Sequence, residues 1–466
     1  MRIRVLHLLL LFLAALPSGP LVAVQASGSA AVGAEMAVLP GAASPRIGYW
    51  SWDEVRAQLQ SYRSSRPYLV HVESIGESWE GRDIPAVRIA SPRALEDLDA
   101  PEILFMAGIH PREQAPQVAL MEFLDELVSG YGADERITRL LDTRRVWFIP
   151  VLNVDGKVHD VDHAGPGAPG ANWRVSRRPL ENGEYGVDLN RNGAVGWGGG
   201  SPNPGTATYH GEGPISEPET RALYDFLEAR GFRVYLDIHS SLERYLLPGH
   251  LIREEARRYR RLVEGLQARQ AEPYAGGPRM KETQASAQLG TGAGQTHATG
   301  FYLHGAYSIV YEIGPPGEEA RFYPGLEEIL AHYRENVREP WFFLLEEAGR
   351  LPPVRSGHVR LVGYELDGTP IPGGRVGILP SVHGDAAYGV LVSASSGAQV
   401  TADYRLYPLG DRGHVLRLSP DVVPGTELPF RLYVWDRDRR RSILEFTVTV
   451  GEPAERTDAG NGASGG

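Results

Sequence analysis

Short apolar runs alternate with longer amphipathic stretches along most of this 466-residue chain. Four of the runs have the length and the bulky side chains of buried strands, and each ends in a turn or in polar residues. Because long helical patterns separate them, the order predicts an α/β domain with a mixed sheet and helices on both faces. The predicted strands are PEILFMAGIH (101–110), VWFIPVLNVDG (146–156), RVYLDIHS (233–240) and YSIVYEIG (307–314).

Helical spacing is clearest in three of the intervening segments. One of them opens with Ser216, carries Glu219 three residues later and closes on Gly231, which is typical of a capping box and a glycine C-cap. Another is expected to be interrupted or kinked at Pro340. The predicted helices are residues 115–132, 216–231 and 325–350.

The pattern changes after Pro352 and Pro353. Short apolar strands follow, separated by Gly, Pro and Asp turns, with no helical spacing among them. This predicts a small all-β sandwich over 354–451 after an α/β domain over 47–350, and then a disordered tail over 452–466.

The N-terminus has the pattern of a signal peptide over residues 1–26, because Arg2 and Arg4 precede an apolar run from Val5 to Leu16. That run is short for a membrane span, so we expect no stable span after processing and a secreted or periplasmic protein. A disordered or anchored N-terminus is the alternative. Residues 27–46 are expected to form a flexible leader that is too short to fold alone.

Composition narrows the possible partners. The formal net charge is -11, and phosphate binding needs clustered Lys and Arg, so a general nucleic-acid binder is disfavoured. The chain has no cysteine, so it has no disulfide.

Polar residues capable of metal chemistry follow three of the predicted strands. His110, Glu113, His239 and Glu312 stand at or just beyond the carboxyl ends of strands, where ligands gather in open α/β sheets. Two histidines and a carboxylate leave a fourth zinc position open, which is the catalytic arrangement. Glu312 is then the candidate for the proton transfer that such a site requires.

The spacing His-x-x-Glu is weak evidence by itself, because it occurs twice. The second copy, His332 and Glu335, lies in a charged helical pattern and is predicted to be a solvated helix face.

An ordered set of further motifs carries a resemblance. HPREQ and NVDG are followed by WRVSRRP (173–179), GVDLNRN (186–192), YHGEGPISEPET (209–220), DIHS and YEIG, and SIGESWEGRDIPAVRIA (74–90) precedes them. Over about residues 47–345 the chain resembles the zinc carboxypeptidases of the carboxypeptidase A type. The resemblance implies the fold of the zinc carboxypeptidases, one bound Zn²⁺, and hydrolysis of the C-terminal peptide bond of peptides or proteins.

The resemblance also implies roles for individual residues. His110, Glu113 and His239 match the zinc ligands, and Glu312 matches the general base.

The remaining matched residues face the substrate. Arg174 matches the arginine that stabilises the oxyanion, Asn190 and Arg191 match the pair that binds the terminal carboxylate, and Arg112 matches an arginine of the substrate groove.

One residue departs from the family's pattern, and the segment of the specificity pocket gives only a preference for the terminal residue. Leu289 aligns with the family's mobile tyrosine, and Tyr302 can replace that tyrosine only in a rearranged loop. The segment that usually lines the specificity pocket aligns with about Gln295 to His297 and holds no aspartate, which favours a neutral or apolar terminal residue. His297 and His304 are expected to be loop histidines and not ligands.

Two other functions stay open. One is an amidohydrolase that acts on a small acylated amino acid or a cell-wall peptide, and the other is a non-catalytic binding protein on a peptidase scaffold. The β module has no motif of its own; its cluster of Arg437 and residues 439–441 is expected to be a solvated hairpin turn, with an anionic partner as the alternative.

Overall fold

The structure is a computed structural model, and its description covers most of the chain from residue 48 to residue 452. The predicted signal peptide and leader, nearly all of the predicted tail, and Leu289 lie outside the described residues. Within the described part, no helix has the length and apolar character needed to cross a membrane. The described residues are 48–162, 170–249, 251, 253–271, 281–284, 294–314, 322–356, 360–383, 388–393, 400–402, 414–436 and 438–452.

A mixed eight-stranded sheet of order β1-β2-β4-β3-β5-β8-β6-β7 forms the centre of the α/β part. The strands β4, β3, β5 and β8 run parallel to one another. The antiparallel pairs are β1 with β2, β2 with β4, and β6 with β8. Every residue of β5 and β8 is buried, as expected for central strands covered on both faces. The strands are β1 (Val70–Glu77), β2 (Asp83–Ile89), β3 (Glu102–Met106), β4 (Arg145–Ile149), β5 (Val234–Ser240), β6 (Arg244–Leu247), β7 (Lys281–Gln284) and β8 (Tyr307–Ile313).

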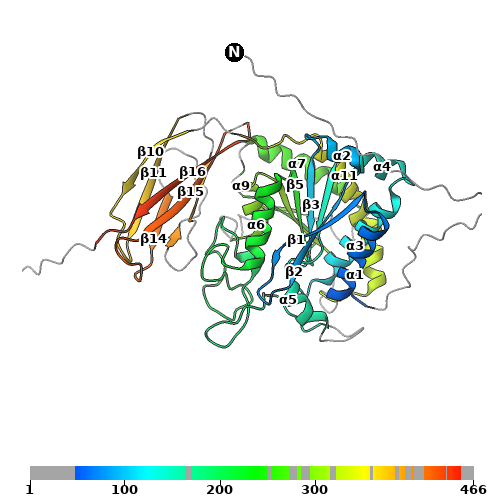
Figure 1. The fold of residues 1–466 in the computed structure, drawn as a ribbon, viewed down its shortest axis with the longest axis horizontal. Coiled ribbons are helices and arrows are strands. Elements are labelled where there is room, and N and C mark those ends of the chain that lie inside the picture. Colours follow the sequence, from blue (N-terminus) through cyan, green and yellow to red (C-terminus); the bar gives the residue numbers. More distant parts are fainter. Residues whose placement is uncertain are drawn as a thin grey trace, which may run out of the picture. The chain divides into compact units, whose positions relative to one another are not determined.

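Helices cover this sheet on both faces, with α6 on one side and α1 and α3 on the other (Figure 1), which confirms the predicted fold class. Aromatic and aliphatic side chains fill the space between helices and sheet, among them Phe105, Phe123 and Trp341, whose rings are in mutual contact. The helices are α1 (Trp52–Ser65), α2 (Pro92–Glu96), α3 (Gln114–Gly130), α4 (Glu135–Leu141), α5 (Val154–Lys157), α6 (Pro218–Arg230), α7 (Arg253–Gln267), α9 (Thr296–Tyr302), α10 (Leu326–His332) and α11 (Arg338–Ala348).

The predicted start of α6 is wrong, whereas its predicted end is confirmed. The N-cap is Glu217, and its side chain makes no capping hydrogen bond. Ser216 stays outside the helix, because its hydroxyl donates to Glu217 and accepts from the amide of Asn192. At the other end Gly231 has φ +64°, the left-handed conformation that favours glycine at a helix C-cap.

The predicted break near Pro340 is present and begins before the proline. A π-helical turn, Tyr333–Val337, joins α10 to α11. Because proline has no N–H, the carbonyl of Asn336 has no helical partner at that position. The hydroxyl of Tyr311 donates to this carbonyl at 2.9 Å, so the sheet satisfies the bond that the helix lacks.

The prediction that His332 lies on a solvated helix face is wrong. His332 is only 3% exposed, and its Nε2 accepts a hydrogen bond from the backbone N–H of Gly314 at 3.3 Å. Glu335 is exposed, as predicted. The charged neighbours of His332 in sequence point outward while the histidine points at the end of β8, a contact that helical spacing could not reveal.

The C-terminal region contains two four-stranded sheets, which confirms the predicted β character. The ring of Tyr364 in one sheet lies 4.6 Å from that of Phe446 in the other, and its hydroxyl donates to the Thr447 carbonyl. The two sheets therefore pack on each other as a sandwich. Their strands are β9 (Arg355–Ser356), β10 (Arg360–Asp367), β11 (Arg375–His383), β12 (Tyr388–Ser393), β13 (Val400–Ala402), β14 (His414–Leu418), β15 (Glu427–Trp435) and β16 (Arg440–Thr449).

The predicted solvated hairpin turn is wrong for Arg439. Its guanidinium is buried 4.1 Å above the ring of Tyr307 and forms an ion pair of 2.9 Å with Glu255 of α7. Arg441 pairs with Glu228 of α6 at 2.9 Å. Arg437 lies outside the described residues. Arg439 and Arg441 thus join the sandwich to the α/β part.

Replacing Arg439 with methionine is expected to lower the free energy of unfolding by about 3 kcal/mol, because it removes the buried member of the two cations that pair with the buried carboxylate of Glu255 and leaves only Arg258. Urea denaturation followed by circular dichroism measures the change. Arg431→Met is the matched control, since the Arg431–Glu445 pair is 52% and 68% exposed and should contribute less than about 1 kcal/mol. Equal losses in the two variants would contradict the importance of the buried pair.

Candidate metal centre

Three side chains from distant parts of the chain meet at the carboxyl edge of the sheet. His110 and Glu113 follow β3, and His239 lies near the end of β5, the neighbouring parallel strand. Gly108 allows the chain to turn there, because its φ is +68° and a Cβ would lie 2.9 Å from the backbone of Val151. The predicted convergence at strand ends is therefore realised.

The potential ligand atoms of these residues all lie within 4.8 Å of one another, and all three residues are buried. Nδ1 of His110 is 2.8 Å from one oxygen of Glu113, and Nδ1 of His239 is 3.1 Å from the other. The two Nδ1 atoms are 3.2 Å apart. The backbone N–H of Ser240 donates to Glu113 and helps to hold its carboxylate in place.

A second carboxylate holds each histidine from behind. Nε2 of His110 lies 3.1 Å from Asp188, and Nε2 of His239 lies 3.1 Å from Asp237. Such partners orient a metal-binding imidazole and select its tautomer. Sequence reasoning missed both aspartates, although Asp237 stands two residues before His239 in a strand, a spacing that places both side chains on one face.

These contacts fit a cation at the centre of the three residues. When each Nε2–H donates to its aspartate, both Nδ1 lone pairs point into the same small space, where a bound cation relieves their repulsion. Burial alone would raise the pKa of Glu113, but His110 and His239 outweigh it and hold that pKa below its usual range. Asp237 and Glu113 likewise outweigh burial and raise the pKa of His239, so the field that favours a proton also favours a metal ion.

Glu312 lies beside this cluster on the next strand. It is in register with His239 across the parallel pair β5 and β8, so both side chains leave the sheet on the same face. Burial raises the pKa of Glu312 to about 7, and its Oε2 has no hydrogen-bond partner among the described residues. A carboxyl group with a pKa near neutrality is suited to accept and return a proton.

The side chain of Arg174 also reaches the cluster. Its guanidinium donates to Asp188 at 2.9 Å and lies 3.8 Å from Glu113 and 3.5 Å from His110. Burial alone would lower the pKa of Arg174, but Asp188 and Glu113 outweigh it and raise the pKa. The arginine is thus held as a cation next to the metal-binding atoms.

Asn190 and Arg191 form a short 3-10 turn next to His239. The backbone N–H of Asn190 donates to Asp188, and its amide nitrogen lies 3.3 Å from Nε2 of His239. Burial lowers the pKa of Arg191 from its ordinary value, although the residue remains a cation. The guanidinium of Arg112 lies 4.1 Å above the ring of Phe322. Asn190 therefore contacts the cluster, and Arg191 is its neighbour in the same turn.

Three other residues considered from the sequence do not join the metal cluster. Tyr302 is buried, and its hydroxyl donates to the carbonyl of Gly249. His304 pairs with Glu228 at 2.9 Å. The prediction that His297 lies in a loop is wrong, because it lies within α9 and is fully buried. Neither histidine belongs to the cluster of potential metal ligands found among the described residues.

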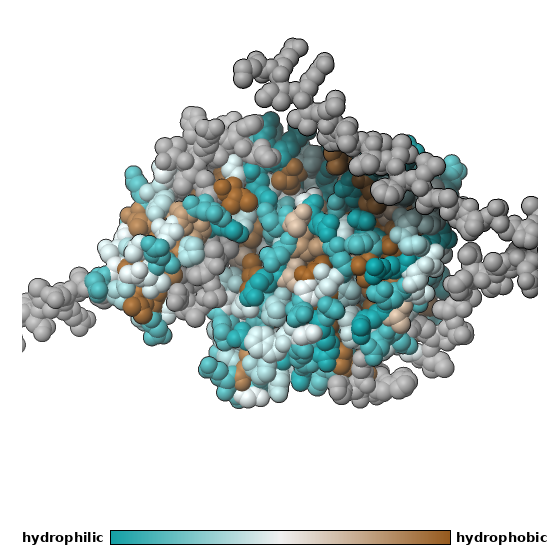
Figure 2. Space-filling model, viewed as in Figure 1, coloured by the Kyte–Doolittle hydropathy of each residue, from teal (hydrophilic) through white to brown (hydrophobic). Residues whose placement is uncertain are grey.

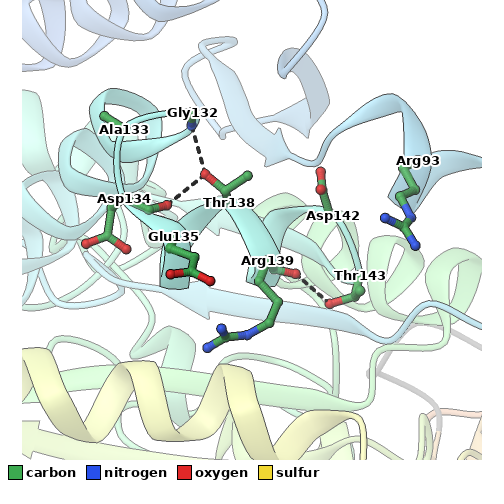
Figure 3. A pocket seen from close by; sticks show the side chains of 9 residues that line it. All are labelled: Arg93, Gly132, Ala133, Asp134, Glu135, Thr138, Arg139, Asp142 and Thr143. Carbon is green, nitrogen blue, oxygen red and sulfur yellow. Dashed lines mark hydrogen bonds between the residues drawn. The ribbon is translucent and has the colours of Figure 1, made fainter.

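A cavity of about 520 Å³ around α4 holds none of these residues (Figure 3). Its polar groups serve the local chain: Asp134 caps α4, and the hydroxyl of Thr138 accepts from the Gly132 backbone. The face shown in Figure 2 is mostly hydrophilic, with hydrophobic residues scattered over it. Neither feature competes with the metal centre as a reactive site. The cavity is lined by Arg93, Gly132, Ala133, Asp134, Glu135, Thr138, Arg139, Asp142 and Thr143.

Comparison with known proteins gives a consistent result. The sequence model described as zinc carboxypeptidase matches residues 55–339. Carboxypeptidase A2 of Mus musculus is 31% identical over 205 residues, which cover 43% of this chain and 46% of the relative. Carboxypeptidase B of Homo sapiens is also 31% identical over 205 residues, covering 43% and 47%. The chain thus spans about half the length of these curated relatives.

The fold has matches among solved structures as well. Carboxypeptidase A from Helicoverpa armigera superposes with a TM-score of 0.54 at 23% identity, covering 65% of this chain and 73% of that one. At this identity the superposition shows a shared fold.

Proposed function

Because the chain belongs to the zinc carboxypeptidase family, we propose that it is a zinc-dependent exopeptidase that hydrolyses the C-terminal peptide bond of peptides or proteins. The observation that carries the proposal is the buried cluster of His110, Glu113 and His239 with Glu312 in register beside it. An exported location, secreted or periplasmic, is proposed from the N-terminal sequence alone.

His110, Glu113 and His239 hold the metal in this proposal, and Asp188 and Asp237 keep the two imidazoles oriented toward it. Zn²⁺ bound there lowers the pKa of water and polarises the scissile carbonyl.

Glu312 takes the proton of the attacking water and passes it to the leaving amine. Its position supports this role, because the carboxyl group is buried beside the cluster with one oxygen unpaired among the described residues. The guanidinium of Arg174 is held by Asp188 and stabilises the negative charge that develops on the carbonyl oxygen when water adds to the carbonyl carbon.

Asn190 and Arg191 bind the terminal carboxylate of the substrate, so the enzyme acts at chain ends. Arg191 offers the planar fork of donors that a carboxylate accepts, and its mostly buried position strengthens that contact. Arg112, above Phe322, contacts the part of the substrate that precedes the scissile bond. Asn190 and Arg191 favour a substrate with a terminal carboxylate, and they suit a short peptide as well as a protein. The presence of all three metal ligands and of Glu312 favours an enzyme over a non-catalytic binding protein.

Incubation of the zinc-loaded protein with peptides of varied C-termini, followed by mass spectrometry, tests the proposal. We expect stepwise loss of residues from the C-terminus, and no loss when the same peptides end in a carboxamide, because Arg191 then has no carboxylate to bind. Internal cleavage, or no cleavage of any peptide, would remove the exopeptidase function.

A further inference from the structure

The C-terminal sandwich contacts the end of α9 through hydrogen bonds to backbone carbonyls. The last four carbonyls of a helix have no partner within the helix, so they need donors from elsewhere. Nε1 of Trp435, at the end of β15, donates at 2.6 Å to the carbonyl of Tyr302, the last residue of α9. The guanidinium of Arg441 donates to the next carbonyl, that of Leu303. The sandwich therefore supplies donors that this helix end requires.

The same contacts leave the end of α9 little room to shift. Gly305 has φ +75°, and a Cβ at this position would lie 2.5 Å from the ring of Trp435. The guanidinium of Arg439 donates to the carbonyl of Gly305. Trp435 and Arg439 are both buried, and hydrogen bonds are stronger in the interior than in water. Side chains of the sandwich thus fix the position of this end of the helix.

The opposite end of α9 holds the side chain of Asn190. The backbone N–H of Thr296, the first residue of α9, donates to Oδ1 of Asn190 at 3.0 Å. Because this oxygen is occupied, the amide nitrogen of Asn190 points away from α9, and it lies 3.3 Å from Nε2 of His239. The nitrogen carries the two N–H groups that can donate to a carboxylate. Thr296 therefore keeps the amide in the orientation in which its donors lie toward the metal cluster.

Further contacts fix α9 to the segment that follows Asn190. The hydroxyl of Thr299 accepts from the backbone N–H of Val195 at 3.2 Å. Gly294, just before α9, donates its N–H to the carbonyl of Val195 at 3.0 Å. Gly294 has φ +71°, and a Cβ at this position would clash with the carbonyl of Arg191. A shift of α9 would therefore move the turn that carries Asn190 and Arg191.

We infer that the sandwich positions the amide of Asn190 through α9, and that Trp435 is a positioning residue for the binding of the substrate's terminal carboxylate. The helix has seven residues, so at 1.5 Å per residue it is about 10 Å long. Trp435 holds one end of it, and Thr296 at the other end holds Asn190. This inference rests on the proposed exopeptidase function. It gives the sandwich a part in substrate binding, although its sequence carries no motif of its own.

Trp435→Phe tests this role in the zinc-loaded protein, because phenylalanine keeps an aromatic ring and removes the N–H that Tyr302 accepts. With one peptide that the wild type cleaves, KM should rise by about 3- to 10-fold, the effect of one hydrogen bond. The values of kcat and bound zinc should stay at those of the wild type, since a contact made equally in the bound substrate and in the transition state affects KM alone. An unchanged KM would overturn the inference and leave the proposed function standing; no cleavage by the wild type would overturn both.

Trp147→Phe is the matched control. Trp147 is also fully buried, and its Nε1 donates to Glu102 at 2.7 Å, so this variant loses a hydrogen bond within the central sheet and away from α9. Both variants should lower the melting temperature, but only Trp435→Phe should raise KM. Equal rises of KM in the two variants would assign the effect to general destabilisation and overturn the positioning role.

A double-mutant cycle with Asn190→Ala tests whether the effect passes through Asn190. Residues that are far apart and share no partner normally have independent effects on binding, which multiply in the double variant. If Trp435 acts by positioning the Asn190 amide, Trp435→Phe should have little further effect on KM once that amide is absent. The full rise of KM in the Asn190→Ala background would overturn the inference. Arg441→Met, which removes the donor to Leu303, gives a second variant for the same cycle and the same expected result.

Discussion

Replacing Glu312 with glutamine is expected to lower kcat by about 100- to 10,000-fold, the usual contribution of a positioned general base. Glutamine keeps the size and the hydrogen-bonding capacity of the side chain but cannot accept the proton of the water. Glu312 is not one of the three clustered ligands, so bound zinc, measured by atomic absorption, should stay at one per chain. Steady-state kinetics on the best peptide of the C-terminal series measures the loss.

Glu219 provides the matched control for this substitution. It is also fully buried, and burial likewise raises its pKa to about 7, but it accepts its hydrogen bond from the backbone of Trp79 and belongs to α6. Glu219→Gln should therefore retain the wild-type kcat. If Glu312→Gln retained it as well, Glu312 would lose its assigned role; if it lost zinc, the effect would belong to the metal and not to proton transfer.

Removal of a metal-binding side chain should lower the affinity for zinc, and activity should fall as a consequence. His239→Ala is expected to weaken zinc binding by more than about 100-fold, since even the partners behind a ligand contribute 10- to 100-fold. It deletes one of the two imidazoles and leaves Asp237 and Glu113 without the ring that separates them. Equilibrium dialysis against a zinc buffer measures the affinity, and activity should fall with occupancy.

The control for this variant is His71→Ala, because His71 is a half-exposed histidine on β1, away from the carboxyl edge of β3 and β5. Its zinc affinity should equal that of the wild type. Undiminished zinc in His239→Ala would contradict the ligand set. Retained metal in Glu312→Gln together with lost metal in His239→Ala would separate the two roles.

Local sequence patterns determined the elements and much of the chemistry. Continuous apolar runs predicted β3, β4, β5 and β8, and glycine at position 231 predicted the end of α6. Strand-end placement predicted that His110, Glu113 and His239 would meet, because parallel neighbouring strands end at one edge of a sheet. These features depend on the periodicity of apolar residues and on the direction of the strands, and both can be read from the order of the residues.

Tertiary structure decided which side chains are paired and which are buried. His332 and Arg439 have charged neighbours in sequence, yet each is buried by an element far along the chain. Asp188 and Asp237 stand out only once the structure shows that they contact the imidazoles of His110 and His239. The physical reason is that burial and pairing are set by packing between distant segments, whereas a residue's local pattern reports only the face on which it stands.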